Sequence, residues 1–169
     1  PATKLIDENI DLQTHAFSVK IVRWRMADSC QMRLANQILT LYIPEKSDMT
    51  NPDIQWTIRE MIRRAMRFEA KRILSCKTAF FAQKNGLEYH DVKINKSMGR
   101  WGSCSRKKRI NFSFFLMLLP EKYIDYVVLH ELAHTREMNH SDRFWQLLTR
   151  FCGEDAKKIS RNLRTLQIE

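Results

Sequence analysis

The segment from His130 to His140 constrains this chain more than any other, because it opens with the pattern H-E-x-x-H and closes on a third histidine. Residues four apart on an α-helix lie one turn apart on the same face, so His130 and His134 can share a metal ion. Glu131 lies about 100° round the helix from His130, where a carboxylate is better placed to act on a water molecule than to bind the metal. The segment therefore predicts a zinc site with a neighbouring general base.

A catalytic zinc ion keeps three protein ligands and one open position, so a third ligand is needed. His140 follows His134 by six residues, which is the spacing of the motif H-E-x-x-H-x-x-G-x-x-H. Glu137 replaces the glycine of that motif. We expect Asn139 to make the sharp turn instead, because asparagine tolerates a positive φ better than most non-glycine residues. The spacing favours His140 as the third ligand.

Glu154 is the alternative third ligand. It follows His134 by twenty residues, and a glutamate at about that distance on a following helix completes a His₂Glu zinc site. His140 is preferred because it closes a shorter loop and because Ser141 can begin a helix that fixes it. Glu154 follows Gly153 and then serves as an acidic residue at the start of a helix.

Three ligands and a carboxylate predict peptide-bond hydrolysis. Zinc lowers the pKa of bound water from about 15.7 to about 7, and Glu131 would take the proton and pass it to the leaving amine. A strand at residues 110–114 is a candidate edge for an extended substrate, or equally a core strand. The pattern favours no single residue for stabilising the oxyanion. The candidates are Arg100, Tyr123, Tyr126 and Arg143.

Alternating apolar residues predict short strands in two parts of the chain. A polar turn at residues 35–37 separates two of them. The predicted strands span residues 16–25, 32–34, 38–43, 89–95 and 110–114.

Cap residues and helical spacing predict four helices. Asn51 and Pro52 suit the start of a helix of roughly 30 residues that ends in the Asn-Gly pair at 85–86. Pro120, as a first helical residue, opens the helix that carries H-E-x-x-H, and its many apolar positions predict burial on most sides. Two further helices are expected after Ser141 and over residues 154–166.

Composition bounds the class of protein. The chain is 44% apolar and 28% charged, which predicts one domain at residues 1–169, with a β section at 1–48 packed onto a catalytic part at 49–169. Four widely spaced cysteines without C-x-x-C favour reduced thiols and a cytoplasmic protein. The longest apolar stretch, residues 114–119, is too short to cross a bilayer. No signal peptide is visible, although a chain that begins at Pro1 leaves a processed leader open.

Several short motifs, in order along the chain, closely resemble the YgjP-like family of small bacterial zinc metallopeptidase domains. That family is distantly related to the SprT/Spartan and WLM groups. The motifs are RWGSCS at 100–105, IN at 110–111, Pro120, IDYVVLHELAH at 124–134, NHS at 139–141 and FW at 144–145.

The resemblance implies an α+β, zincin-like metallopeptidase fold with zinc at His130, His134 and His140 and with Glu131 as the catalytic base. In this fold we expect a long helix on the N-terminal side, a small, mainly antiparallel sheet and a buried H-E-x-x-H helix. Thr135 departs from the family, which usually has a large apolar residue there. The role of the RWGSCS segment is left open between packing and substrate contact.

The leading hypothesis is therefore a zinc peptidase acting on peptides or proteins. The net charge of +10 indicates either simple solubility or a polyanionic partner such as DNA, and a protease of DNA-associated proteins is the narrower version. The alternative is a basic nucleic-acid-binding module with a non-catalytic zinc site, which needs a fourth ligand such as Cys104. An inactive scaffold is the third possibility.

Overall fold

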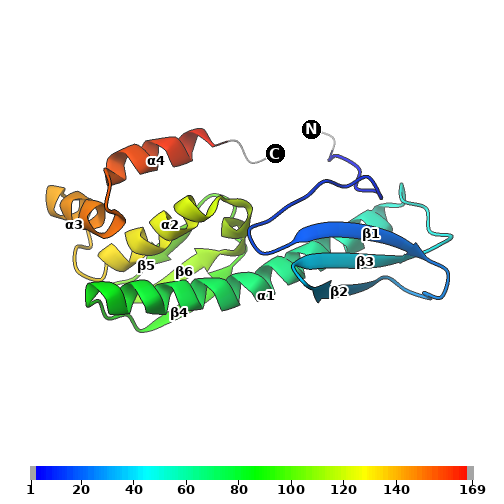
Figure 1. Cartoon of the computed structure of the whole chain (residues 1–169), viewed down its shortest axis with the longest axis horizontal. Helices are drawn as coiled ribbons and strands as arrows, with labels where there is room; N and C mark the ends of the chain where they lie inside the picture. Colours follow the sequence, from blue (N-terminus) through cyan, green and yellow to red (C-terminus); the bar gives the residue numbers. More distant parts are fainter. Residues whose placement is uncertain (1–2, 167–169) are drawn as a thin grey trace. The chain divides into compact units, whose positions relative to one another are not determined.

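Figure 1 shows the computed structural model, which describes residues 3–166 as a mixed α+β chain and so confirms the expected class. The chain divides into two compact units, Pro1–Phe68 and Glu69–Glu169. The division falls inside the long helix α1, Pro52–Asn85. The expected single domain, with a β section at residues 1–48, stays a prediction.

The first unit holds a three-stranded sheet in the order β1-β3-β2. Its central strand β3, Ile38–Pro44, pairs in parallel with β1, Ser18–Trp24, and antiparallel with β2, Gln31–Ala35. The turn between β2 and β3 falls where the sequence predicts it. It uses positive φ at Asn36 (52°) and Gln37 (61°), as tight hairpin turns require.

Alternation along β3 builds the core of the first unit. Leu39, Leu41 and Ile43 are fully buried, while the residues between them are partly exposed. Residues i and i+2 of a strand face the same side, so these three side chains share one face. The first half of α1 adds the fully buried Ile58 and its apolar neighbours one turn further along.

Helix α1 has 34 residues and begins and ends at the predicted caps. The side-chain oxygen of Asn51 accepts a hydrogen bond from the backbone N–H of Asp53 at 2.8 Å. Gly86, with φ of 63°, ends the helix in the left-handed conformation, and the N–H of Leu87 donates to the carbonyl of Ala82 at 2.8 Å. These are the bonds that close helix ends, so local sequence alone defines this element.

The second unit repeats the same strand order, β4-β6-β5. The central strand β6, Arg109–Ser113, pairs in parallel with β4, Asp91–Asn95, and antiparallel with β5, Gly102–Cys104. The expected single, mainly antiparallel sheet is thus two mixed sheets, because in each unit the first strand runs beside the third in the same direction. The strand expected at 110–114 is central rather than an edge, since both of its sides are paired.

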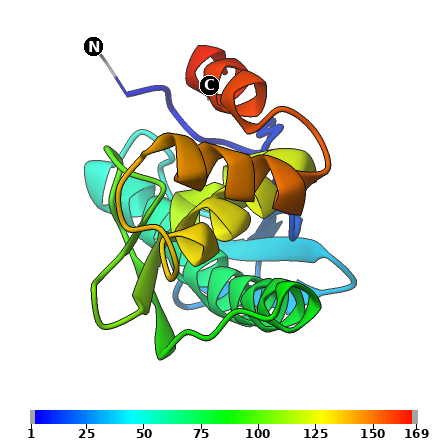
Figure 2. The ribbon, with the colours of Figure 1, turned by 90° about the vertical axis from the view of Figure 1, so that its left-hand side faces the viewer.

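The helices of the second unit follow the sheet. After the 3₁₀ helix η1, Phe114–Leu118, come α2, Glu121–Ala133, α3, Asp142–Cys152, and α4, Ala156–Thr165. Helix α2 contacts β5 on one side and both α3 and α4 on the other (Figures 1 and 2). It is therefore the buried layer of this unit, as its apolar sequence predicts.

Two cap predictions for these helices differ in outcome. Pro120 is the N-cap of α2 rather than its first helical residue, a shift of one position. Ser141 caps α3 as expected, because its Oγ accepts a hydrogen bond from the N–H of Phe144 at 3.4 Å. Within residues 3–166, no helix combines the length and apolar character that crossing a membrane requires.

Candidate metal centre

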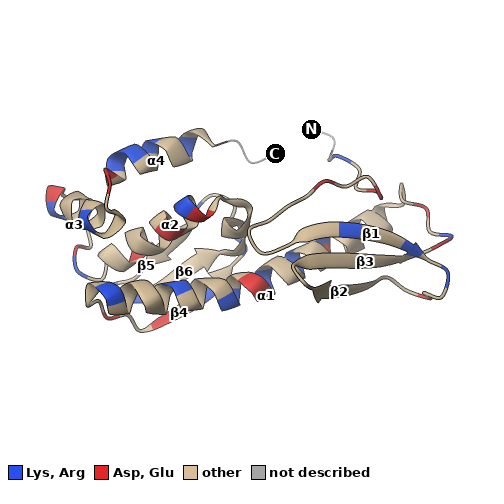
Figure 3. Cartoon of the chain, viewed as in Figure 1, with Lys and Arg blue, Asp and Glu red and all other residues tan. Residues whose placement is uncertain are grey.

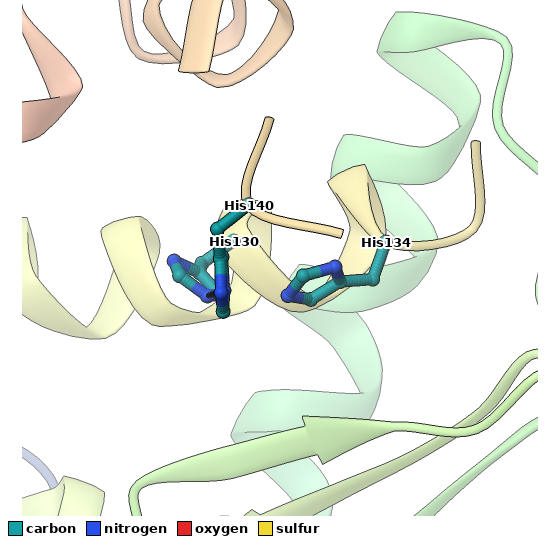
Figure 4. A group of neighbouring side chains, drawn as sticks. All are labelled: His130, His134 and His140. Atoms are coloured by element: carbon teal, nitrogen blue, oxygen red, sulfur yellow. Dashed lines mark hydrogen bonds between the residues drawn. The ribbon is translucent and has the colours of Figure 1, made fainter. Parts of the chain in front are cut away.

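The three histidines of the H-E-x-x-H region converge in the second unit (Figure 4). His130 and His134 stand at the end of α2, and His140 approaches from the segment between α2 and α3. Their ligand nitrogens all lie within 4.8 Å of one another, and the Nε2 atoms of His130 and His140 are 3.2 Å apart. Ligand nitrogens on one tetrahedral zinc ion lie about 3.3 Å apart, given Zn–N bonds of about 2.0–2.1 Å. The donor set therefore fits a zinc ion.

Polar partners orient two of the imidazoles. The hydroxyl of Tyr126 lies 3.2 Å from Nδ1 of His130, and Nδ1 of His134 lies 3.0 Å from the carbonyl oxygen of Glu137. A histidine that donates from Nδ1 is left with an unprotonated Nε2, which is the form that binds metal. Tyr126 therefore belongs to the support of the centre, whereas the sequence indicates it only as an oxyanion candidate.

An aromatic wall packs against the same rings. The ring of His134 stacks on Phe144 at 4.5 Å and 19°, and Phe144 is fully buried. Burial lowers the pKa of His130 to about 3, with smaller contributions from the charges of His134 and His140. Burial also lowers the pKa of His134. Neutral imidazoles are the state that metal binding requires.

The turn that brings in the third histidine differs from the expected one. Of the described residues, those with positive φ do not include Asn139, so the prediction of a left-handed asparagine is wrong. The reversal starts directly after α2, where the N–H of Thr135 donates to the carbonyl of Leu132 and that of Arg136 to Ala133, at 3.0 and 3.1 Å. Such i→i+3 bonds tighten the end of α2, and the chain leaves the helix without a left-handed residue at the position of the motif glycine.

Glu131 is the buried carboxylate of the centre, with only 6% of its surface exposed. Burial raises its pKa to about 8, and the positive charge of Arg100 opposes that shift. The side chain lies against β5. A Cβ atom at Gly102 would come 3.0 Å from Cγ of Glu131, 3.2 Å from its Oε1 and 3.1 Å from the carbonyl oxygen of Asn111. A larger residue here would force these neighbours to shift, so glycine suits this close approach.

Gly102 thus gives the RWGSCS segment a structural role that sequence reasoning missed. The available signal was the glycine itself, because a glycine within a strand often marks a close backbone approach. Trp101 and Gly102 are both half-buried, and β5 contacts α2 directly. The segment is therefore part of the wall around Glu131.

Neither Cys104 nor Glu154 joins the histidines. Burial, and then the charge of Glu131, raise the pKa of Cys104 to about 11, and its Sγ lies 3.5 Å from the carbonyl oxygen of Ser105. The carboxylate of Glu154 pairs with Lys122 at 2.9 Å. Among residues 3–166, the cluster of possible metal ligands contains the three histidines and no fourth side chain. Three side chains would leave one position open on a tetrahedral ion, which is typical of catalytic rather than structural zinc sites.

The remaining candidates for stabilising the oxyanion lie in different places. Arg100 lines a pocket together with Glu131. Arg143 lines a different hollow with Arg136 and Arg150. Tyr123 lines neither hollow. Of the four candidates, the structure brings Arg100 and Tyr126 to the centre.

Comparison with known proteins gives a family match over most of the chain. The model of the YgjP-like family, described as a metallopeptidase domain, matches residues 8–166. No curated protein matches the chain.

Two solved structures are similar over about half of the chain. The metallopeptidase zymogen abylysin of Pyrococcus abyssi has 26% identity and a TM-score of 0.48, over 54% of this chain and 92% of that one. The metallopeptidase zymogen jannalysin of Methanocaldococcus jannaschii has 18% identity and a TM-score of 0.47, over 54% of this chain and 93% of that one.

Proposed function

The chain belongs to the YgjP-like metallopeptidase family, and we propose that it cleaves peptide bonds at the three-histidine centre, with Zn²⁺ as its metal and Glu131 as its general base. Family membership makes it a metallopeptidase that acts on peptides or proteins; the ion and the roles of the residues are the proposal. The observation that carries it is the buried carboxylate of Glu131 beside three converging imidazoles.

His130, His134 and His140 would hold the ion. Bound there, zinc supplies a Lewis acid that acidifies water and polarises a carbonyl group. The positive charge of a bound ion would favour the ionised form of Glu131, against the burial that raises its pKa. In that form its carboxylate accepts a proton from the attacking water and delivers it to the nitrogen of the leaving amine. Gly102 lets β5 pack against that carboxylate, which limits where its oxygens can lie.

Strand β5 is the better candidate for pairing with an extended substrate. It lies at one end of the order β4-β6-β5, so one of its sides has no strand partner among the described residues. It also contacts the helix that carries Glu131. An edge strand at this position can hold a substrate backbone by main-chain hydrogen bonds next to the reacting groups. This moves the predicted substrate edge from residues 110–114 to Gly102–Cys104.

The test measures bound metal and cleavage of an unfolded protein in parallel. Wild type should bind one zinc ion per chain and cleave. Glu131→Gln should keep the metal and lose cleavage by about a thousandfold or more, since several kcal/mol of barrier lowering depend on the base. His130→Ala should lose both, and His90→Ala, at a histidine whose side chain is 57% exposed, should lose neither. Full cleavage by Glu131→Gln, where His130→Ala is inactive, would show that Glu131 is not the base.

A narrower form of the proposal places the substrates on DNA, in a reducing cytoplasm. The net charge of +10 supports it, as do the lysines and arginines along α1 and α4 (Figure 3). All four cysteines are free, as expected in a reducing compartment. Binding that contacts two phosphates or more should weaken roughly tenfold or more between about 50 and about 200 mM salt. Absent or salt-independent DNA binding would remove this form and leave the peptidase proposal intact.

A further inference from the structure

A pocket of about 280 Å³ opens beside the metal centre in the second unit. His130 and Glu131 line part of it, and the rest is lined by two further residues of α2, by residues 100–102 at the start of β5 and by residues of α4. The pocket is thus continuous with the groups proposed to carry out hydrolysis. A substrate residue next to the cleaved bond is the natural occupant of such a hollow.

The lining of this pocket has two chemical parts. Val127 and Leu163 are buried, with 4% and 9% of their surfaces exposed, and form an apolar wall with the half-buried Trp101. Arg100 and Arg164 are exposed and add two guanidinium groups from different elements. An apolar wall combined with paired cations suits a ligand with an aliphatic part and an anionic tip.

The charges of both arginines reach groups inside the pocket. The positive charge of Arg100 lowers the pKa of Glu131 against the larger effect of burial, and that of Arg164 acts on the hydroxyl of Tyr126. The ion pairs found among residues 3–166 do not include either arginine. Both guanidinium groups therefore keep donors for a ligand.

We propose that this pocket is a specificity site for an acidic side chain of the substrate, best filled by glutamate. The methylene groups of glutamate would pack on Val127 and Leu163, and its carboxylate would accept hydrogen bonds from Arg100 and Arg164. The inference rests on the proposed peptidase function and adds to it a preference for glutamate beside the scissile bond. Arg164 is a specificity-determining residue in this assignment, since it belongs to α4 rather than to the metal centre.

Peptides that differ at one position test the assignment. Glutamate, glutamine or lysine is placed at each position flanking the cleaved bond, and kcat/KM is measured. At one position wild type should prefer glutamate to glutamine by about tenfold to a hundredfold, because a hydrogen bond to a charged group contributes about 1.5–3 kcal/mol. Arg164→Glu should abolish that preference and favour lysine. Arg164→Lys should keep part of it.

Arg161→Glu is the matched control, because Arg161 is an exposed arginine of the same helix that does not line the pocket. It makes the same change in net charge and should leave the preference unchanged. If Arg161→Glu and Arg164→Glu alter the preference equally, the effect is one of overall charge and the pocket assignment fails. A C-terminally amidated copy of each peptide separates the two sources of a carboxylate. A preference that disappears on amidation belongs to the chain terminus and also overturns the assignment.

Binding to metal-loaded Glu131→Gln separates the two proposals. Fluorescence anisotropy should show tighter binding of the glutamate peptide than of the glutamine peptide, and Arg164→Glu in that background should remove the difference. Such binding without cleavage by wild type would refute the peptidase proposal and support the pocket. Cleavage by wild type without a glutamate preference would support the peptidase and refute the pocket.

Discussion

The two three-stranded sheets share one plan, and the second borders the candidate metal centre. Each places its third strand in the middle, with the first strand parallel to it and the second antiparallel. They differ in the second strand. Strand β2 is largely exposed, whereas β5 is short, half-buried and in contact with α2. The glycine of β5 sits against the carboxylate of Glu131, and no comparable residue occurs in β2.

Strand connectivity is the same in both sheets, so it does not by itself determine function here. The same pairing pattern supports core packing in one unit and forms a wall of the proposed active site in the other. What changes is the second strand of each sheet. Helix α2 packs against β5, and β5 has a glycine where it meets Glu131 of that helix. Substitutions in the candidate site and in the ion pairs should therefore affect the two units differently, whereas those in the hairpin turns should affect them alike.

Gly102→Ala should have the largest effect. The new Cβ would lie 3.0 Å from Cγ of Glu131, too close for ordinary contact, so the carboxylate must shift. We expect kcat/KM to fall by up to about a hundredfold, because misplacing a reacting group by about 1 Å can cost that much in catalysis. Bound zinc should stay at the wild-type level. Gly99→Ala is the control, since nothing lies within 4 Å of its Cβ position, and it should be fully active. Equal loss in both variants would show that Gly102 has no special role.

Tyr126→Phe should have the next largest effect. It removes the hydroxyl that lies 3.2 Å from Nδ1 of His130. Loss of such a partner weakens metal binding by about tenfold to a hundredfold, which a competition titration with a chelator would measure. Tyr123→Phe, on the same helix, is the control and should bind zinc like wild type. Unchanged affinity in Tyr126→Phe would mean that the hydroxyl does not orient the imidazole.

The ion pairs of the two units should differ in their contributions to stability. The side chain of Lys77 is only 18% exposed and lies 2.7 Å from Asp125 and 2.9 Å from Glu121, whereas Arg25, paired with Glu45, is 85% exposed. Lys77→Met should lower the free energy of unfolding by about 1 kcal/mol, measured by urea denaturation. Arg25→Met should match wild type. Similar losses in both variants would contradict the expected role of burial.

The Lys77 contribution also has a direction in pH. Burial opposes its charge, but the hydrogen bonds that its ammonium group donates to Asp125 and Glu121 outweigh that effect and raise its pKa above the ordinary lysine value. A raised lysine pKa stabilises the folded state below the unfolded pKa, and the gain is lost as the pH rises through the folded value. The stability difference between wild type and Lys77→Met should therefore be constant near neutral pH and shrink in strong alkali.

The smallest effect is expected in the hairpin turns. Gln37 and Lys108 hold positive φ, of 61° and 60°, in the turns that precede the two central strands. A left-handed conformation costs a residue other than glycine about 1 kcal/mol or more, so Gln37→Gly and Lys108→Gly should each stabilise the protein by about 0.5 kcal/mol. Thermal unfolding would measure the gain. If only one of the two variants is stabilised, the left-handed residue is strained in one hairpin turn and not in the other, which contradicts the prediction.

Local signals predicted much of this molecule. Asn51 and the Asn-Gly pair at 85–86 define α1 through their own hydrogen bonds, and alternation defines β1 and β3. The H-E-x-x-H spacing places two histidines on one helical face, which needs no knowledge of the rest of the chain. Where a signal lies within one element, sequence and structure agree.

Non-local features escaped prediction. Strand β5 has three residues without alternation and exists through its pairing with β6. The central position of β6 depends on partners on both sides, so its own sequence could not show that it is not an edge. The sequence predicts the turn to His140 at Asn139, because that prediction considers a single left-handed residue as the means of turning the chain. The chain instead leaves α2 through a hydrogen-bonded turn at residues 134–136, with no positive φ at Asn139.

The proposed ligands of the metal centre are close neighbours along the chain, since the second histidine follows the first by four positions and the third follows the second by six. Bridging positions so near in sequence constrains little of the unfolded chain, because the entropy of closing a loop grows with its length. The ion should thus add little to the stability of the whole fold and much to the order of one short backbone segment. Chelation should speed hydrogen exchange at amides 134–141, whereas β6 and the first half of α2 keep their protection.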